Sequence, residues 1–389
     1  MPYTGQVNSL RIFLFFFHAS VTIIISFLPV YFKSEGLSGA QIGWLLAIGP
    51  MISMITQPIA GFLSDKYKTV KKLLLISLLG TIVFGTIMFQ MHTFALFLLV
   101  GLFFFAFMSP LGALGDSLTQ TTATISNKKF GSIRSFGSLG FATASLIGGV
   151  ILGFIGIANV GYVFIGLLSI AFLLCLKVTD VSLSKNPVTV IDTFKLFKNR
   201  RLVVFLGIML FITITHRTND SYLGIYIESL GGNEQLIGLA WFIAVLSEAI
   251  IFATSRHWID RFNLTTLIVV ASLVYTVRWF LFSIANDPSF IIMFQFMHGL
   301  SFGIFFSCAF EYVSRLVPRD YIATGHLLFI MFFFGFSGII GSLAGGMILD
   351  VYGGSTLYVV LGIMTLIGSL ALYAFSYKTE QKKENVLAH

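Results

Sequence analysis

The stretch LRIFLFFFHASVTIIISFLPVYF, residues 10–32, decides the class of this protein. It is longer than the apolar core of a signal peptide and contains no small-residue cleavage site, so we interpret it as a membrane-spanning helix. Similar apolar runs recur along the chain. Each is about 20 residues long, the length that a helix rising about 1.5 Å per residue needs to cross a hydrocarbon core of about 30 Å.

These runs predict an all-α membrane protein with twelve transmembrane helices in two halves of six. The division is an N-terminal half at 1–178, a cytoplasmic linker at 179–201, and a C-terminal half at 202–389 with a short cytoplasmic tail. The expected helices are 9–32, 41–63, 72–91, 93–118, 131–156, 158–177, 202–229, 236–255, 264–285, 288–313, 321–349 and 354–376.

Composition excludes a soluble globular domain, because 57% of the residues are hydrophobic and only 10% are charged. Of the 24 Lys and Arg residues, only Lys33 falls in a segment expected outside the cell. Arg134, Arg217 and Arg278 fall inside expected helices, and the others gather in alternate loops and at the helix ends beside them. By the positive-inside rule this pattern places both termini in the cytoplasm. The net charge of +8 therefore serves topology, and we expect a multi-pass protein of the cytoplasmic membrane that binds no nucleic acid.

The sequence offers no sign of an enzyme. Cys175 and Cys308 lie in apolar helices and supply neither a disulfide framework nor a set of metal ligands. The His-Glu-x-x-His motif is missing from the sequence, and the Gly-x-Ser-x-Gly pattern at residues 299–303 lies inside an expected transmembrane helix, so it is no strand-to-helix nucleophile elbow. We therefore expect no catalytic residue, no metal and no cofactor.

Glycines and loop charges indicate that the two halves repeat each other. The expected helices 131–156 and 321–349 are both rich in glycine, which lets membrane helices approach closely. Asp65-Lys66 follows the second helix of the first half, and Asp260-Arg261 follows the second helix of the second half. Two matching halves are the architecture of alternating-access transporters.

Ionisable residues inside the expected helices mark the candidate pathway. Such groups cost about 3 kcal/mol or more in a bilayer unless they are paired or hydrated. Glu248 and His298 should lie near the midplane, and Arg278 should lie deep enough for its guanidinium to meet Glu248. The candidates are Asp116, Arg134, His216, Arg217, Asp220, Glu248, Arg278 and His298. A lone histidine on an apolar face, such as His18, is more often part of the core.

The segment GFLSDK, residues 61–66, resembles the cytoplasmic signature of the major facilitator superfamily. The resemblance implies a conformational latch made by Gly61, Asp65 and Lys66, in which the carboxylate of Asp65 caps the N-terminus of another helix. Lys68 departs from the pattern, since the family often has glycine there.

Further stretches resemble a narrower group, the phenylpropionate permease-like branch related to lactose permease. The stretches that carry this resemblance are FGSIRSFGSLGF at 130–141, PLGALGD at 110–116, EAIIFA at 248–253, VRW at 277–279 and QFMHGLSF at 295–302.

This resemblance implies a proton-coupled symporter with the major facilitator fold. It assigns solute hydroxyls to Asp116 and Arg134 and ring stacking to Phe141. It also assigns binding and proton coupling to Glu248, Arg278 and His298. We add His216, Arg217 and Asp220 to the expected substrate site. Ser301 stands where lactose permease has its proton-carrying carboxylate, so we expect Glu248, Asp220 or His298 to carry the proton.

The leading hypothesis is proton symport of an aromatic or other organic acid. A sugar or nucleoside symporter is the first alternative and drug efflux is the second, while a membrane-embedded enzyme or a channel fits less well. The expected partners are a small solute, protons and the lipid bilayer, and we expect the chain to act as a monomer.

Overall fold

The computed structural model describes residues 4–180, 196–259, 261–318 and 321–387. Within these ranges it is built from helices, and eleven of them are long and apolar enough to cross a membrane. Most of the predicted linker 179–201 lies outside the described residues, as does Asp260 of the second Asp-Arg pair.

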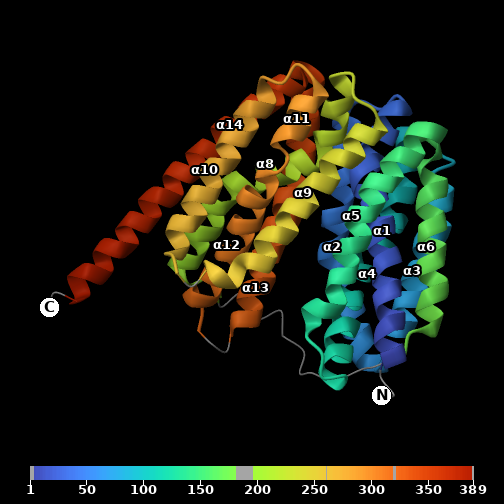
Figure 1. Cartoon of the computed structure of the whole chain (residues 1–389), viewed down its shortest axis with the longest axis horizontal. Helices are drawn as coiled ribbons and strands as arrows, with labels where there is room; N and C mark the ends of the chain where they lie inside the picture. Colours follow the sequence, from blue (N-terminus) through green and yellow to red (C-terminus); the bar gives the residue numbers. More distant parts are fainter. Residues whose placement is uncertain (1–3, 181–195, 260, 319–320, 388–389) are drawn as a thin grey trace. The chain divides into compact units, whose positions relative to one another are not determined.

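The N-terminal part of the chain runs through six long helices (Figure 1). They are α1 (Thr4–Ser34), α2 (Gly39–Tyr67), α3 (Lys71–Met88), α4 (Phe94–Ile125), α5 (Phe130–Ile155) and α6 (Val160–Lys177), with the short turn η1 (Ile157–Asn159) before α6. Ser38 and Gln41 form a reciprocal capping box at the start of α2.

The C-terminal part is more interrupted. Its elements are α8 (Arg200–Ser229), α9 (Glu234–Thr254), η2 (Ser255–His257), α10 (Leu264–Ser283), α11 (Pro288–Phe294), η3 (Gly299–Gly303), α12 (Ile304–Leu316), α13 (Ile322–Ile330), η5 (Met331–Phe336) and α14 (Ser337–Leu387). Two of them, η3 and η5, are π-helical turns inside longer helical runs. The last candidate span, Thr324–Tyr377, is 54 residues long. It is broken at Gly353, where φ is 77° and ψ is 176°.

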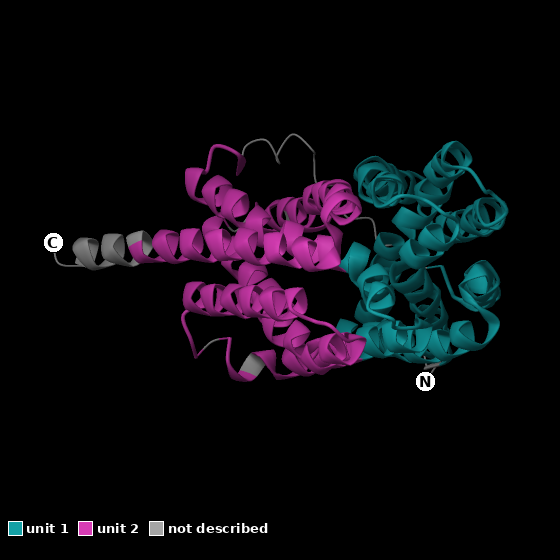
Figure 2. Ribbon diagram, turned by 90° about the horizontal axis from the view of Figure 1, so that it is seen from above, with its two compact units in different colours: residues 1–187, 220–242 teal, residues 188–219, 243–389 magenta. Residues whose placement is uncertain are grey.

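The described chain divides into two compact units, shown in different colours in Figure 2. Unit 1 comprises Met1–Pro187 and Asp220–Phe242, and unit 2 comprises Val188–Asn219 and Ile243–His389. The boundary therefore falls within helices α8 and α9 rather than only in the linker. The end of α8 and the start of α9 pack with the N-terminal helices.

In unit 1 the core forms around α1, which packs against α5 and α6. The approach of α1 to α5 is possible because Gly140 has no side chain. A Cβ at this position would lie 2.1 Å from the backbone oxygen of Phe15. Small residues at such crossings replace the hydrophobic effect as the packing device of membrane helices.

In unit 2, α10 packs against α14 and α12. Hydroxyl groups of α8 reach across to α14 from buried positions. Thr213 and Thr215 share hydrogen bonds with Ser337 and Thr365 at 2.6 and 2.9 Å. These bonds satisfy polar groups that could find no water in a hydrocarbon core.

The turn after α2 has a defined geometry. Lys68 ends α2 in the left-handed region with φ 50°, a conformation that glycine adopts without steric cost. The next helix, α3, is capped by Asp180, whose Oδ1 accepts the backbone N–H groups of Val70 and Lys71 at 3.1 Å each. Asp65 is exposed here, so its role in a latch remains a prediction.

Candidate substrate and coupling sites

The first polar cluster joins α4 and α5 in unit 1. Arg134 Nε donates to Asp116 Oδ1 at 2.7 Å. The side chains are 30% and 47% exposed, respectively. A bonded guanidinium and carboxylate that remain this open can also bind hydroxyl groups, because the pair has both donors and acceptors to spare.

His18 of α1 lies beside this pair. A Cβ on Gly137 would lie 2.3 Å from a His18 ring carbon and 2.6 Å from Arg134 Nη1, so the absent side chain leaves room for both groups. Neither ring nitrogen of His18 has a hydrogen-bond partner among the described residues. The sequence pattern predicted a core position; the ring nitrogens of His18 are buried, and they lie next to the candidate binding pair.

Phe141, the expected stacking residue, lies on α5 two turns beyond Arg134. Its ring meets that of Trp241 in an edge-to-face arrangement, with centroids 6.3 Å apart. Trp241 belongs to the part of α9 that packs in unit 1. Trp241 is not among the residues predicted from the sequence.

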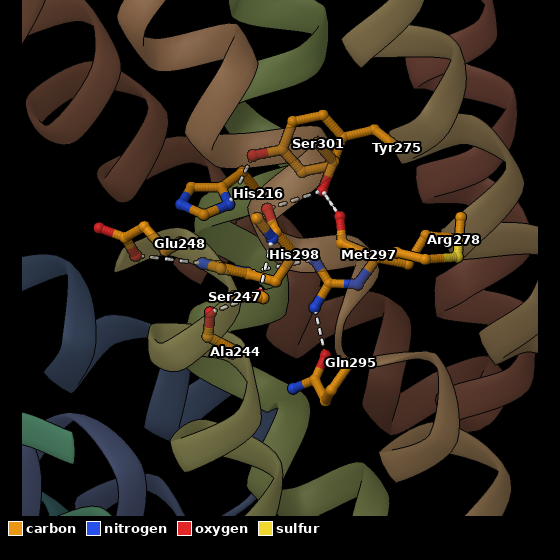
Figure 3. A network of polar contacts seen from close by, with 11 residues as sticks. His216, Ala244, Ser247, Glu248, Tyr275, Arg278, Gln295, Met297, His298 and Ser301 are labelled. Carbon is orange, nitrogen blue, oxygen red and sulfur yellow. Dashed lines mark hydrogen bonds and ion pairs between the residues drawn. The ribbon is translucent and has the colours of Figure 1, made fainter. Parts of the chain in front are cut away.

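The second cluster lies in unit 2 and centres on His298 (Figure 3). His298 Nε2 lies 3.6 Å from Glu248 Oε2, and Arg278 Nη1 donates to His298 Nδ1 at 3.2 Å. Arg278 Nη2 also donates to Gln295 Oε1. The imidazole of His298 thus connects Glu248 with Arg278, the two residues that were expected to meet.

The direction of these hydrogen bonds indicates which ring nitrogen of His298 carries the proton. An arginine has no acceptor, so its bond to Nδ1 requires that nitrogen to carry a lone pair. The ring proton then sits on Nε2, which faces the carboxylate of Glu248. The carboxylate is 25% exposed, while Arg278 is fully buried. The open end of this chain of contacts is therefore Glu248.

His216 of α8 packs against the same cluster. It shares a hydrogen bond of 3.0 Å with the Tyr275 hydroxyl, and its ring stacks on Phe302 at 4.6 Å between centroids. The His216 and His298 rings lie 5.6 Å apart. Two histidines and one carboxylate thus lie close together in a largely apolar helical unit.

The π-helical turn Gly299–Gly303 begins directly after His298. Such turns are frequent at functional sites, since the extra residue changes the direction of side chains relative to a regular helix. Ser301, in this turn, donates its hydroxyl to the backbone oxygen of Met297 at 2.7 Å. Its hydroxyl is therefore engaged with the backbone.

The remaining predicted site residues lie on α8 and in the turn after α2. The guanidinium of Arg217 lies over the ring of Phe334 at 5.6 Å, and Asp220 belongs to the end of α8 that packs in unit 1. In the expected latch, Lys66 lies near the rings of Phe62 and Tyr67.

Four residues of these clusters were not predicted from the sequence to be site residues. Gln295 carried a signal, since a buried amide lies one helical turn before His298. Tyr275 and Trp241 carried none, because aromatic residues are common throughout this chain. His18 was noticed but interpreted as core. No group of three or more His, Cys, Asp or Glu residues that could hold a metal occurs in the described part of the chain.

The chain matches the MFS_1 like family over residues 7–360 and belongs to it. The maltose permease of Geobacillus stearothermophilus is 31% identical over 366 residues, which cover 92% of this chain and 91% of that protein. A probable 3-phenylpropionic acid transporter of Escherichia coli (strain K12) is 25% identical over 310 residues, covering 79% and 81%.

The crystal structure of the nucleoside transporter NupG has the same fold. It superposes with a TM-score of 0.88 at 18% identity and covers 96% of this chain and 99% of its own. By its family the protein is a transporter of the major facilitator superfamily, and the described residues form a helical fold. It is a multi-pass protein of the cell membrane and not an enzyme. The alternative of a membrane-embedded enzyme is therefore excluded.

Proposed function

We propose that this protein is a proton-coupled symporter of a small polar solute. The observation that carries the proposal is the contact chain from Glu248 through His298 to Arg278. Family membership supports secondary transport in general, and these contacts supply groups that can bind and release a proton.

Coupling follows from the chemistry of the chain. The proton affinity of Glu248 depends on the charges and donors around it. A solute that displaces the His298 ring, or changes its contact with Arg278, changes that affinity. Binding of solute and binding of a proton to Glu248 are then linked, as symport requires. Ser301 cannot take this role because its hydroxyl does not ionise.

For the substrate we infer a neutral, polyhydroxylated solute, the class of the first alternative. The Asp116–Arg134 pair presents a carboxylate and a guanidinium that together have little net charge. Arg278 is committed to His298 and Gln295. Sugar hydroxyls match such a pair, and the similarity to a maltose permease over most of both chains supports this class.

An organic acid remains the second candidate. Arg217 lies in unit 2 over Phe334, an arrangement that could bind the carboxylate and the ring of an aromatic acid. The similarity to a probable 3-phenylpropionic acid transporter supports this substrate and the assignment to the phenylpropionate permease-like branch.

The test is uptake into proteoliposomes with an imposed proton gradient, using radiolabelled maltose and 3-phenylpropionate as probes. The Glu248→Gln variant should lose gradient-driven accumulation but keep exchange of labelled for unlabelled solute, because exchange needs no net proton movement. Glu311→Gln is the matched control, since Glu311 lies 44% exposed in an ordinary pair with Arg315. Normal accumulation by the Glu248→Gln variant would refute coupling through this residue.

The same assay separates the two substrate classes. Arg134→Lys should weaken maltose binding about tenfold, because an ammonium cannot replace the forked donors of a guanidinium. Preference for 3-phenylpropionate over maltose would select the second candidate.

We further propose twelve spans with both termini in the cytoplasm, and a monomer as the working unit. The break at Gly353 divides the last candidate span into two stretches that can each cross a core of about 30 Å. Labelling of single cysteines placed before and after Gly353, from either side of the membrane, tests this topology. Sizing of the purified protein tests the monomer.

A further inference from the structure

Helices α5 and α9 approach each other closely at a pair of glycines in unit 1. A Cβ on Gly238 would lie 2.2 Å from the backbone oxygen of Ser145, and one on Gly149 would lie 2.6 Å from the backbone oxygen of Glu234. The charge distribution predicts that this crossing is near the outer face of the membrane. The close approach of α5 and α9 determines which side chains lie just inward of the crossing.

Trp241 is one helical turn inward from Gly238, where its ring meets Phe141 at 6.3 Å. It is only 5% exposed. Its indole N–H has no hydrogen-bond partner within the described part of the chain. A buried donor left unpaired costs free energy, and buried indole groups usually find an acceptor. Packing alone would be served by phenylalanine, which has no such donor.

The position of Phe141 relates this aromatic pair to the polar pair of the same unit. Phe141 lies seven residues after Arg134 on α5, a rise of about 10 Å. Arg134 of the polar pair and Phe141 of the aromatic pair therefore lie at two levels of α5, about 10 Å apart along the helix axis. A solute with a ring that is apolar on its faces and hydroxylated at its edge would match both levels.

We propose that Trp241 is a substrate-binding residue that stacks on a sugar ring opposite Phe141 and donates its indole N–H to an oxygen of that sugar. The inference rests on the neutral-solute class proposed above. In the present structure the two aromatic rings meet each other directly. With solute bound, the sugar ring takes the place between them, and the indole N–H gains the acceptor that it lacks here. Trp241 thus supplies the donor that Phe141 does not have.

The test is maltose binding to the detergent-purified full-length chain, measured by titration calorimetry. Trp241→Phe keeps an aromatic ring and removes the donor, so it should weaken binding about two- to tenfold. Trp241→Ala also removes the stacking surface and should weaken binding more than tenfold. Trp44→Phe is the control, since Trp44 is exposed on α2, and its affinity should equal that of the unmodified chain. Thermal unfolding of each variant shows that it is folded.

The outcomes separate this inference from the proposed function. If Asp116→Asn abolishes binding while both Trp241 variants keep full affinity, the role of Trp241 is refuted and the sugar site stands. If the Trp241 variants bind weakly but a proton gradient drives no uptake in the unmodified protein, coupling is refuted and the role of Trp241 stands. Failure of the unmodified chain to bind maltose contradicts both the role of Trp241 and the sugar class.

Discussion

Replacing Gly238 by alanine should force α5 and the start of α9 apart. The added Cβ would lie 2.2 Å from Ser145 O and 3.0 Å from Gly149 Cα. Both are backbone atoms of α5, which no side-chain rotation can remove. Ordinary contact begins near 3.4 Å, so the helices must separate by about 1 Å locally. Overpacking of this kind costs about 1–3 kcal/mol.

That energy acts only on the conformation in which the two helices are in contact. In alternating access the predicted N-terminal half would rock against the predicted C-terminal half, and this crossing would then open, because α5 and α9 belong to different predicted halves. A penalty of about 1–3 kcal/mol on the closed form favours the open one by about 5- to 150-fold. The variant should therefore remain folded while it spends more time open at this end.

The opening can be measured with a cysteine in place of Ser145, which is fully buried beneath the crossing. The native Cys175 and Cys308 are also buried, so background labelling should be slow. In membranes, the rate of labelling by N-ethylmaleimide at position 145 should rise in the Gly238→Ala background in proportion to the open population. Gly112→Ala is the control, since its Cβ would meet nothing within 4 Å. Equal labelling rates in the two backgrounds would refute the reasoning.

Two further predictions concern the turn between α2 and α3 and are tested by thermal unfolding in detergent. Asp180→Asn should lower stability by about 1–2 kcal/mol, because it removes the charge that caps α3. Asp65→Asn is the control, since Asp65 is exposed and its replacement should leave stability unchanged. Equal effects of the two substitutions would contradict the capping role. Lys68→Gly should raise stability by about 1 kcal/mol by relieving a left-handed φ of 50°. Asn127→Gly, at φ 52°, should gain less, since asparagine tolerates this region; a larger gain at Asn127 would contradict the strain argument.

Helix positions followed closely from hydropathy, because the length of an apolar run and its polar ends are local properties. The predicted helix at 131–156 is observed at Phe130–Ile155. The prediction failed at the end of α4, expected at residue 118 and observed at Ile125. Residues 119–125 include four threonines, and hydropathy falls where the helix continues. Thr119 bonds to the Gly115 oxygen at 2.7 Å, so a polar residue is accommodated without ending the helix.

From the sequence, only the depth of each site residue along its helix could be predicted. Counting residues from helix ends places Glu248 and His298 at a common depth, since helical rise is constant. It does not give the azimuth of a side chain around its helix. The π-helical turn after His298 changes that azimuth and has no sequence signature that could have revealed it. The order Glu248–His298–Arg278 therefore emerged only from the fold.

The membrane class, the helices, their orientation and the ionisable residues that are costly in a bilayer could all be predicted from the sequence, because each depends on composition along a single segment. The tertiary structure decided which residues are neighbours. It placed His18 beside Arg134, Trp241 against Phe141, and His298 between Glu248 and Arg278. The physical reason is that helix crossings depend on small residues such as Gly137 and Gly238, whose partners lie far away in the sequence.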